Sequence, residues 1–133
     1  MTDLEARNKA NEIYDLLDNI ATGHMYYCEV SGSLHFNFRI SNAFGYLDCA
    51  VTPVDDKYKI KVTYCVNIAT TLILYEVDGI SGDELNNTMV SIIDYLDKEW
   101  VEYNKGKEYK GWSGYPKAKV IKYNNHGYVV SVS

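Results

Sequence analysis

Between residues 25 and 77 the chain alternates apolar and polar side chains in five successive runs, which are separated only by short, turn-prone connections. A period of two is typical of β-strands with one buried face. Parallel neighbours would need a crossover of about a dozen residues, and no connection here is that long. We therefore predict an antiparallel meander, with a turn over residues 53–56 after the third strand. Its strands are expected over residues 25–30, 34–40, 44–52, 57–65 and 70–77.

A helical segment precedes the meander. Its apolar side chains recur at steps of three and four residues, which is the pattern of an α-helix with one buried stripe. Thr2 and Glu5 have the spacing of a capping box, in which the two side chains satisfy free amides at the start of the helix. We expect Gly23 to end this helix. The stripe consists of Ala6, Ala10, Ile13, Leu17 and Ile20.

A second, longer helix is predicted after the meander. Ser81 and Glu84 repeat the capping-box spacing, and Lys105-Gly106 is a stop signal. Between them the apolar stripe consists of Leu85, Met89, Ile92, Leu96, Trp100 and Tyr103.

The last part of the chain predicts a β-hairpin. Residues 117–123 and 128–132 are separated by a turn-prone segment, and a loop rich in glycine and aromatic residues, 107–116, precedes them. With 133 residues the chain has the usual size of one domain. We thus expect a single α+β domain over residues 1–133: a helix, a meander of about five strands, a second long helix and a C-terminal hairpin. This order is similar to that of secretion-chaperone-like domains, although their third helix is missing.

Charge is segregated along the chain. Residues 1–104 hold seventeen acidic and seven basic side chains, whereas residues 105–133 hold six lysines and one glutamate. The basic tail also carries several tyrosines, a combination that in other proteins tracks single-stranded nucleic acid. An internal role, in which the basic hairpin neutralises acidic helices, is the competing interpretation. The acidic helix faces are interpreted first as solvated surfaces and second as surfaces that repel nucleic acid or occupy a basic groove on a partner.

The polar face of the predicted meander supplies most of the candidate partner-binding residues. Its three lysines favour an acidic or phosphate-bearing partner, or else protect an exposed edge strand from pairing, which is the interpretation we favour. Two rings of the 107–116 loop are candidate anchors if exposed, and otherwise cap the core. The candidate residues are His35, Arg39, Tyr46, Lys57, Lys59, Lys61, Trp112 and Tyr115.

Enzymatic activity is the less favoured expectation. His35 with Glu29 or Asp48 has the composition of a general base and its carboxylate, but residue type alone does not make such a pair. The chain contains no phosphate-binding glycine loop, dinucleotide fingerprint, zinc-protease motif or nucleophile elbow. No cofactor or metal site is predicted. Cys28, Cys49 and Cys65 are widely spaced within expected strands, which favours free, buried thiols.

These observations predict a small, non-enzymatic, cytoplasmic binding or regulatory protein that recognises another protein, as an inhibitor or chaperone-like adaptor. Eleven lysines against two arginines are typical of low-GC bacteria and their phages. A nucleic-acid-associated factor that uses the basic hairpin is the alternative, and a small enzyme centred on His35 is the third. No run is long enough to cross a membrane. The free edge of the last hairpin offers a route to a homodimer.

Overall fold

The computed structural model describes residues 1–17, 20–43 and 45–133. Within these residues the chain forms one seven-stranded sheet, whose strands lie in sequence order with all neighbours antiparallel. The predicted α+β architecture is therefore confirmed. The elements are α1 (Asp3–Leu16), β1 (Thr22–Tyr27), β2 (Leu34–Phe38), β3 (Leu47–Val54), β4 (Lys57–Asn67), β5 (Thr70–Ile80), α2 (Gly82–Asn104), β6 (Lys119–Tyr123) and β7 (Val129–Val132).

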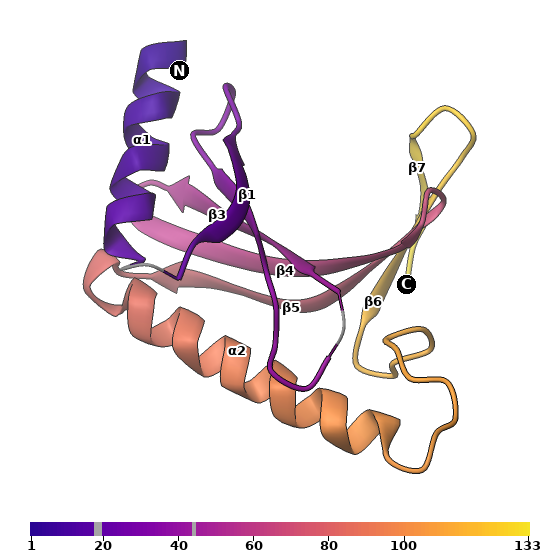
Figure 1. The fold of residues 1–133 in the computed structure, drawn as a ribbon. Helices are drawn as coiled ribbons and strands as arrows, with labels where there is room; N and C mark the ends of the chain where they lie inside the picture. The colour runs from indigo at the N-terminus through magenta and orange to yellow at the C-terminus, as the bar shows by residue number, and fades with distance from the viewer. Residues whose placement is uncertain (18–19, 44) are drawn as a thin grey trace.

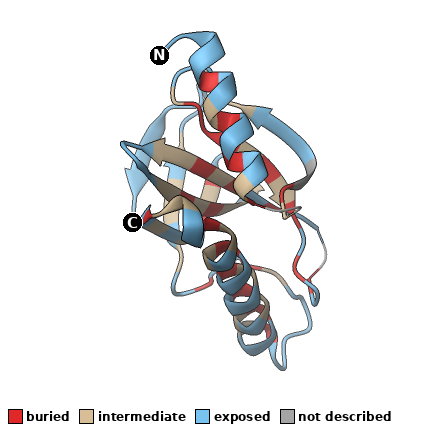
Figure 2. Cartoon of the chain, turned by 90° about the vertical axis from the view of Figure 1, so that its left-hand side faces the viewer, coloured by how far each residue is buried: buried red, intermediate tan, exposed pale blue. Residues whose placement is uncertain are grey.

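The sheet is bent, so that the β1–β2 hairpin at one end and the β6–β7 hairpin at the other rise away from α2 (Figure 1). Both helices pack on the same face of the sheet. Helix α1 packs against β1 and β2, and α2 packs against β4 and β5. The buried positions form a stripe along each helix (Figure 2). This arrangement leaves one face of the sheet covered by helices and the other face open.

Helix α1 begins as predicted and ends earlier than predicted. The Glu5 amide donates to the Thr2 hydroxyl oxygen at 3.1 Å, and that hydroxyl donates to the Glu5 carboxylate. The helix stops at Leu16 rather than at Gly23, and β1 already begins at Thr22. The helical period did not reveal this boundary because β1 is held by pairing with β2, which is a contact between separate parts of the chain.

Helix α2 follows its predicted stripe, and its buried residues include Leu85, Met89, Ile92, Leu96 and Trp100. The second capping box is not formed. Ser81 is the N-cap residue, but its side chain makes no cap hydrogen bond, and the Glu84 amide donates to the Ser81 carbonyl instead. At the other end the helix stops at Asn104, and Gly106 has a positive φ of 77°, which only glycine adopts without strain.

The third and fourth strands extend beyond their predicted limits. β3 runs through Pro53 to Val54, and the tight turn consists of Asp55 and Asp56, with Asp55 at φ 57°. β4 continues to Asn67. β4 lies fourth of seven in the strand order, so the lysines at 57, 59 and 61 are on a central strand. Our interpretation of these lysines as protection for an edge strand is therefore wrong.

Alternation along each strand sends apolar side chains towards the helices. In β2, Leu34, Phe36 and Phe38 are buried, whereas His35 and Asn37 between them are half-buried on the other face. In β3 the Cys49 Sγ lies 3.9 Å from Met89 Sδ of α2, which places its face of the sheet against that helix. The core is thus the layer between the sheet and the two helices.

The 107–116 loop belongs to this core. Trp112 is 2% exposed and Tyr115 is 5% exposed. The Trp112 ring centroid lies 5.3 Å from that of Trp100 and 5.0 Å from that of Tyr115. Of our two interpretations of these rings, burial supports the one in which they complete the core.

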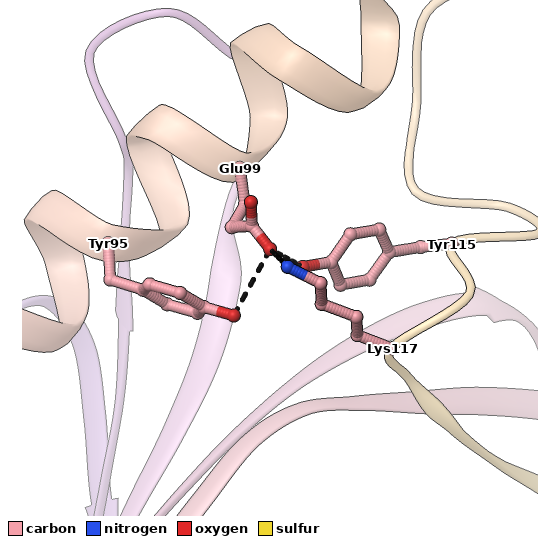
Figure 3. Close-up of polar contacts among 4 residues, drawn as sticks. All are labelled: Tyr95, Glu99, Tyr115 and Lys117. Atoms are coloured by element: carbon pink, nitrogen blue, oxygen red, sulfur yellow. Dashed lines mark hydrogen bonds and ion pairs between the residues drawn. The ribbon is translucent and has the colours of Figure 1, made fainter.

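A carboxylate on α2 fastens this loop to the helix (Figure 3). Oε1 of Glu99 accepts hydrogen bonds from the Tyr95 hydroxyl at 3.1 Å, from the Tyr115 hydroxyl at 2.6 Å and from the Lys117 ammonium. These donors lower the pKa of Glu99, with Lys117 the largest contributor. Burial, together with the Glu99 carboxylate, raises the pKa of Tyr115. The cluster therefore keeps Glu99 ionised and Tyr115 protonated.

Candidate functional site

The open face of the sheet contains a hollow of about 350 Å³, which we call the polar hollow. Six strands contribute to it, because the bend of the sheet brings β1 and β6 towards a common space. Concave sites of this kind are the usual places where proteins bind small ligands or peptide segments. The residues that line it include Tyr26, His35, Asn37, Asp48, Ala50, Lys61, Thr63, Cys65, Thr71, Ile121 and Tyr123.

One end of the polar hollow is formed by a stacked pair of rings. Tyr26 of β1 lies opposite His35 of β2 in the register, and their ring centroids are 4.6 Å apart with an interplanar angle of 8°. The Tyr26 side chain remains 58% exposed. The Tyr26 ring therefore covers one face of the His35 ring.

His35 lies between a cation and a carboxylate. Burial lowers the pKa of His35, and the Lys61 ammonium lowers it further, while Asp48 acts in the opposite direction. Burial raises the pKa of Asp48, against the influence of His35. His35 is therefore a neutral imidazole near pH 7.

His35 and Asp48 do not form the hydrogen-bonded pair that a general base requires. In the β2–β3 ladder His35 is opposite Ala50 and Asp48 is opposite Asn37, so the two side chains are diagonal neighbours. In the part of the chain that is described, no hydrogen bond joins them. Glu29 lies outside the strands and does not line the polar hollow.

The lysines of β4 differ in their partners. Lys59 forms an ion pair with Glu76 of β5 at 3.6 Å, and Lys119 of β6 approaches the same carboxylate at 3.9 Å. Lys61 is opposite Ala50 on one side and Glu76 on the other, and it lines the polar hollow. Among the described residues, Lys61 takes part in no ion pair. Its ammonium is thus the cation available inside the hollow.

Two further predicted residues lie beyond the end of β2. The Arg39 guanidinium is 5.5 Å from the centre of the Tyr46 ring, at cation–π distance. Their loop is held to α2, because the backbone and side-chain amides of Asn42 donate to the Asp97 carboxylate at 3.0 to 3.1 Å. Neither Arg39 nor Tyr46 lines the polar hollow itself.

The structure divides the sequence-derived candidates into three groups, one of which is the Arg39 and Tyr46 pair beyond the end of β2. His35 and Lys61 line the polar hollow. Lys59 and Lys57 lie two and four residues before Lys61 in β4, so the alternation of the strand places them on the same open face. Trp112 and Tyr115 are buried beside α2 and offer no surface to a partner. The sequence reasoning missed the lining residues of β5 and β6, Thr71, Ile121 and Tyr123, because only the bend of the sheet brings these strands towards the polar hollow.

The three cysteines occupy different environments. Cys49 is buried, and burial raises the pKa of its thiol. Cys28 is half-buried, and hydrogen bonds from Ser31 lower its pKa. Cys65 is exposed at the polar hollow, and its thiol donates to the Asn67 carbonyl at 3.3 Å. The expectation of buried thiols therefore holds for Cys49 alone.

Within the described residues no group of three or more His, Cys, Asp or Glu side chains is arranged to hold a metal ion. None of the described helices has the length and apolarity that crossing a membrane requires. A scan of protein-family models and searches of curated proteins and of solved structures found no match to this chain.

Proposed function

We propose that this protein is a non-enzymatic binding protein that recognises an acidic segment of another protein in its polar hollow. The observation that carries this proposal is the position of Lys61, an ammonium without a carboxylate partner among the described residues, inside a concave site. A carboxylate from a partner would supply the missing counter-charge.

The other lining groups fit a peptide better than a chemical reaction. Asn37 and Thr63 carry side-chain hydrogen-bond donors and acceptors suited to a peptide backbone. The exposed Tyr26 ring gives apolar contact area at low entropic cost, which is why tyrosine is common in binding sites. His35 lacks the hydrogen-bonded carboxylate that would orient it as a base. A regulatory role and a cytoplasmic setting are part of this proposal.

Binding to nucleic acid is disfavoured by the contacts of the basic tail. Lys117 is bound to Glu99, Lys119 approaches Glu76, and Lys122 donates to the Thr70 hydroxyl at 3.1 Å. These lysines therefore neutralise or cap groups of their own chain. A phosphate backbone would have to compete with those contacts.

Titration of isotope-labelled protein with an oligo-glutamate peptide, followed by amide NMR shifts, tests the proposal. We expect the largest shifts at His35, Asn37, Lys61 and Thr63. Lys61→Glu should weaken the affinity by roughly tenfold or more, because it places like charges together. The matched control is Lys98→Glu, which reverses an exposed charge on α2 and should leave the affinity unchanged.

Shifts confined to other surfaces, or equal affinity of the Lys61→Glu and Lys98→Glu variants, would contradict the proposal. A parallel titration with a mixed-sequence single-stranded oligonucleotide addresses the alternative. Tight, steeply salt-dependent binding with shifts along β6 and β7 would favour a nucleic-acid-associated factor instead.

A further inference from the structure

Strand β7 is an exposed edge of the sheet. It pairs with β6 on one side only, and all four of its residues are exposed, with Val130 and Val132 each at 60%. Ser133 exchanges both backbone hydrogen bonds with Val120 of β6, at 2.9 and 3.0 Å. Because these bonds alternate in direction along a strand, Val132 directs its N–H and C=O outwards.

This edge lacks the usual protection against pairing. From Tyr123 to Ser133 the chain contains no lysine, arginine, aspartate, glutamate or proline side chain. Charged side chains, prolines and covering elements are what natural proteins use to block edges. The opposite edge, β1, differs from β7, because its register with β2 is interrupted between Thr22 and Met25, and irregularities of this kind discourage pairing with another strand.

We propose that β7 pairs antiparallel with β7 of a second copy of this chain, about a two-fold axis, to form a continuous sheet across a dimer. Identical strands that meet about a two-fold axis place like side chains near one another, so charged residues there would repel. The absence of charge on β7 removes that penalty. A different protein that binds an edge strand through charged contacts would have no charged side chain to contact on β7.

Closure also favours the β7–β7 pair over other arrangements. Pairing of β7 with β1 of the next copy would be heterologous and would continue into open polymers. The interrupted register of β1 disfavours that arrangement. The two-fold pair uses the β7 edge of both copies, so a third copy has no free β7 edge to which it could bind.

The test is sedimentation equilibrium of the full chain over a range of concentrations. We expect the mass to rise with concentration from 15.2 kDa to twice that value. Val132→Pro removes the outward-directed N–H without loss of a bond to β6, because proline is tolerated on an edge strand whose N–H faces solvent. This variant should weaken dimerisation by roughly tenfold or more, whereas Val132→Thr, which keeps the N–H, should dimerise like the parent.

Two further variants separate the interface from general effects. Val132→Lys introduces like charges across the axis and should also give a monomer. Val90→Lys, at a half-exposed valine of α2, should leave the dimer intact. Thermal unfolding of each monomeric variant checks that the fold is retained. A mass that stays at 15.2 kDa up to about 1 mM, a dimer unaffected by both Val132→Pro and Val132→Lys, or species larger than a dimer would each overturn the proposal.

Discussion

The Tyr115 hydroxyl lies 2.6 Å from Oε1 of Glu99, and this hydrogen bond joins the 107–116 loop to helix α2. The same oxygen accepts from Tyr95 and Lys117 (Figure 3). Of these three donors Tyr115 belongs to the 107–116 loop, Tyr95 lies on α2 itself, and Lys117 directly follows the loop. The packing of Trp112 against Trp100 lies beside it.

Replacement of Glu99 by glutamine should lower the free energy of unfolding by about 1–2 kcal/mol, because hydrogen bonds to a charged acceptor are stronger than those to a neutral one. Urea denaturation measures this change. Glu102→Gln, at an exposed position three residues further along α2, is the control and should change stability by less than about 0.5 kcal/mol. Equal effects of the two substitutions would mean that the Glu99 cluster contributes nothing specific.

The contribution of Glu99 should also depend on pH. The pKa of Glu99 is lowered in the folded protein from its ordinary 4.5, so its stabilisation is present above that pH and is lost as the pH falls through the folded pKa. The contribution of Tyr115 to stability depends on pH in the opposite direction. Its pKa is raised from 10.0, so its stabilisation is complete below pH 10 and falls at higher pH. The difference in unfolding free energy between the parent and Glu99→Gln should be constant from pH 6 to pH 9 and should shrink below pH 4.5. A difference that grew in acid would contradict this sign.

Trp112→Ala should destabilise the fold by about 3–5 kcal/mol, as expected for removal of a fully buried aromatic side chain. Tyr109→Ala in the same loop is the matched control, because Tyr109 is 87% exposed and should cost less than about 0.5 kcal/mol. Chemical denaturation of both variants distinguishes a core role of the loop from a role as a partner anchor. A small effect of Trp112→Ala would return Trp112 to the list of candidate binding residues.

The pKa of His35 should respond to its two charged neighbours in opposite directions. Lys61→Met removes a cation and should raise the pKa, whereas Asp48→Asn removes an anion and should lower it. NMR titration of the imidazole protons measures both changes, with Lys98→Met as a control that should leave the pKa unaltered. Because the folded-state pKa is lowered, protonation of His35 should destabilise the fold as the pH falls below 6.5.

Thiol reactivity should follow exposure. In the native protein a disulfide reagent should modify Cys65 readily and Cys28 as well, while Cys49 should react only after unfolding. The lowered pKa of Cys28 increases its thiolate fraction, and burial of Cys49 suppresses both access and ionisation. Cys65→Ser and Cys49→Ser assign the reactive groups. Rapid modification of Cys49 in the native state would contradict the position of this residue in the core.

The helices and most strands could be predicted because their signals are local. The stripe of α2 depends on a period of 3.6 within one segment, and the alternation of β2 depends on a period of two. The end of α1 was misplaced because Thr22 and its successors are held by β2 rather than by their own helical pattern. The second capping box is not formed, because the spacing of Ser81 and Glu84 permits a side-chain hydrogen bond without requiring it.

The candidate site was predicted in part. His35 and Lys61 were found because alternation assigns a side chain to a face of its own strand. The sequence by itself thus determined which segments become helix or strand and which residues are turned away from the core. The tertiary structure decided that β4 is central, that Trp112 is buried, and that Tyr123 approaches the same hollow as Tyr26. Strand order, loop docking and sheet curvature depend on contacts between distant residues, and the local periodicity of a chain does not encode those contacts.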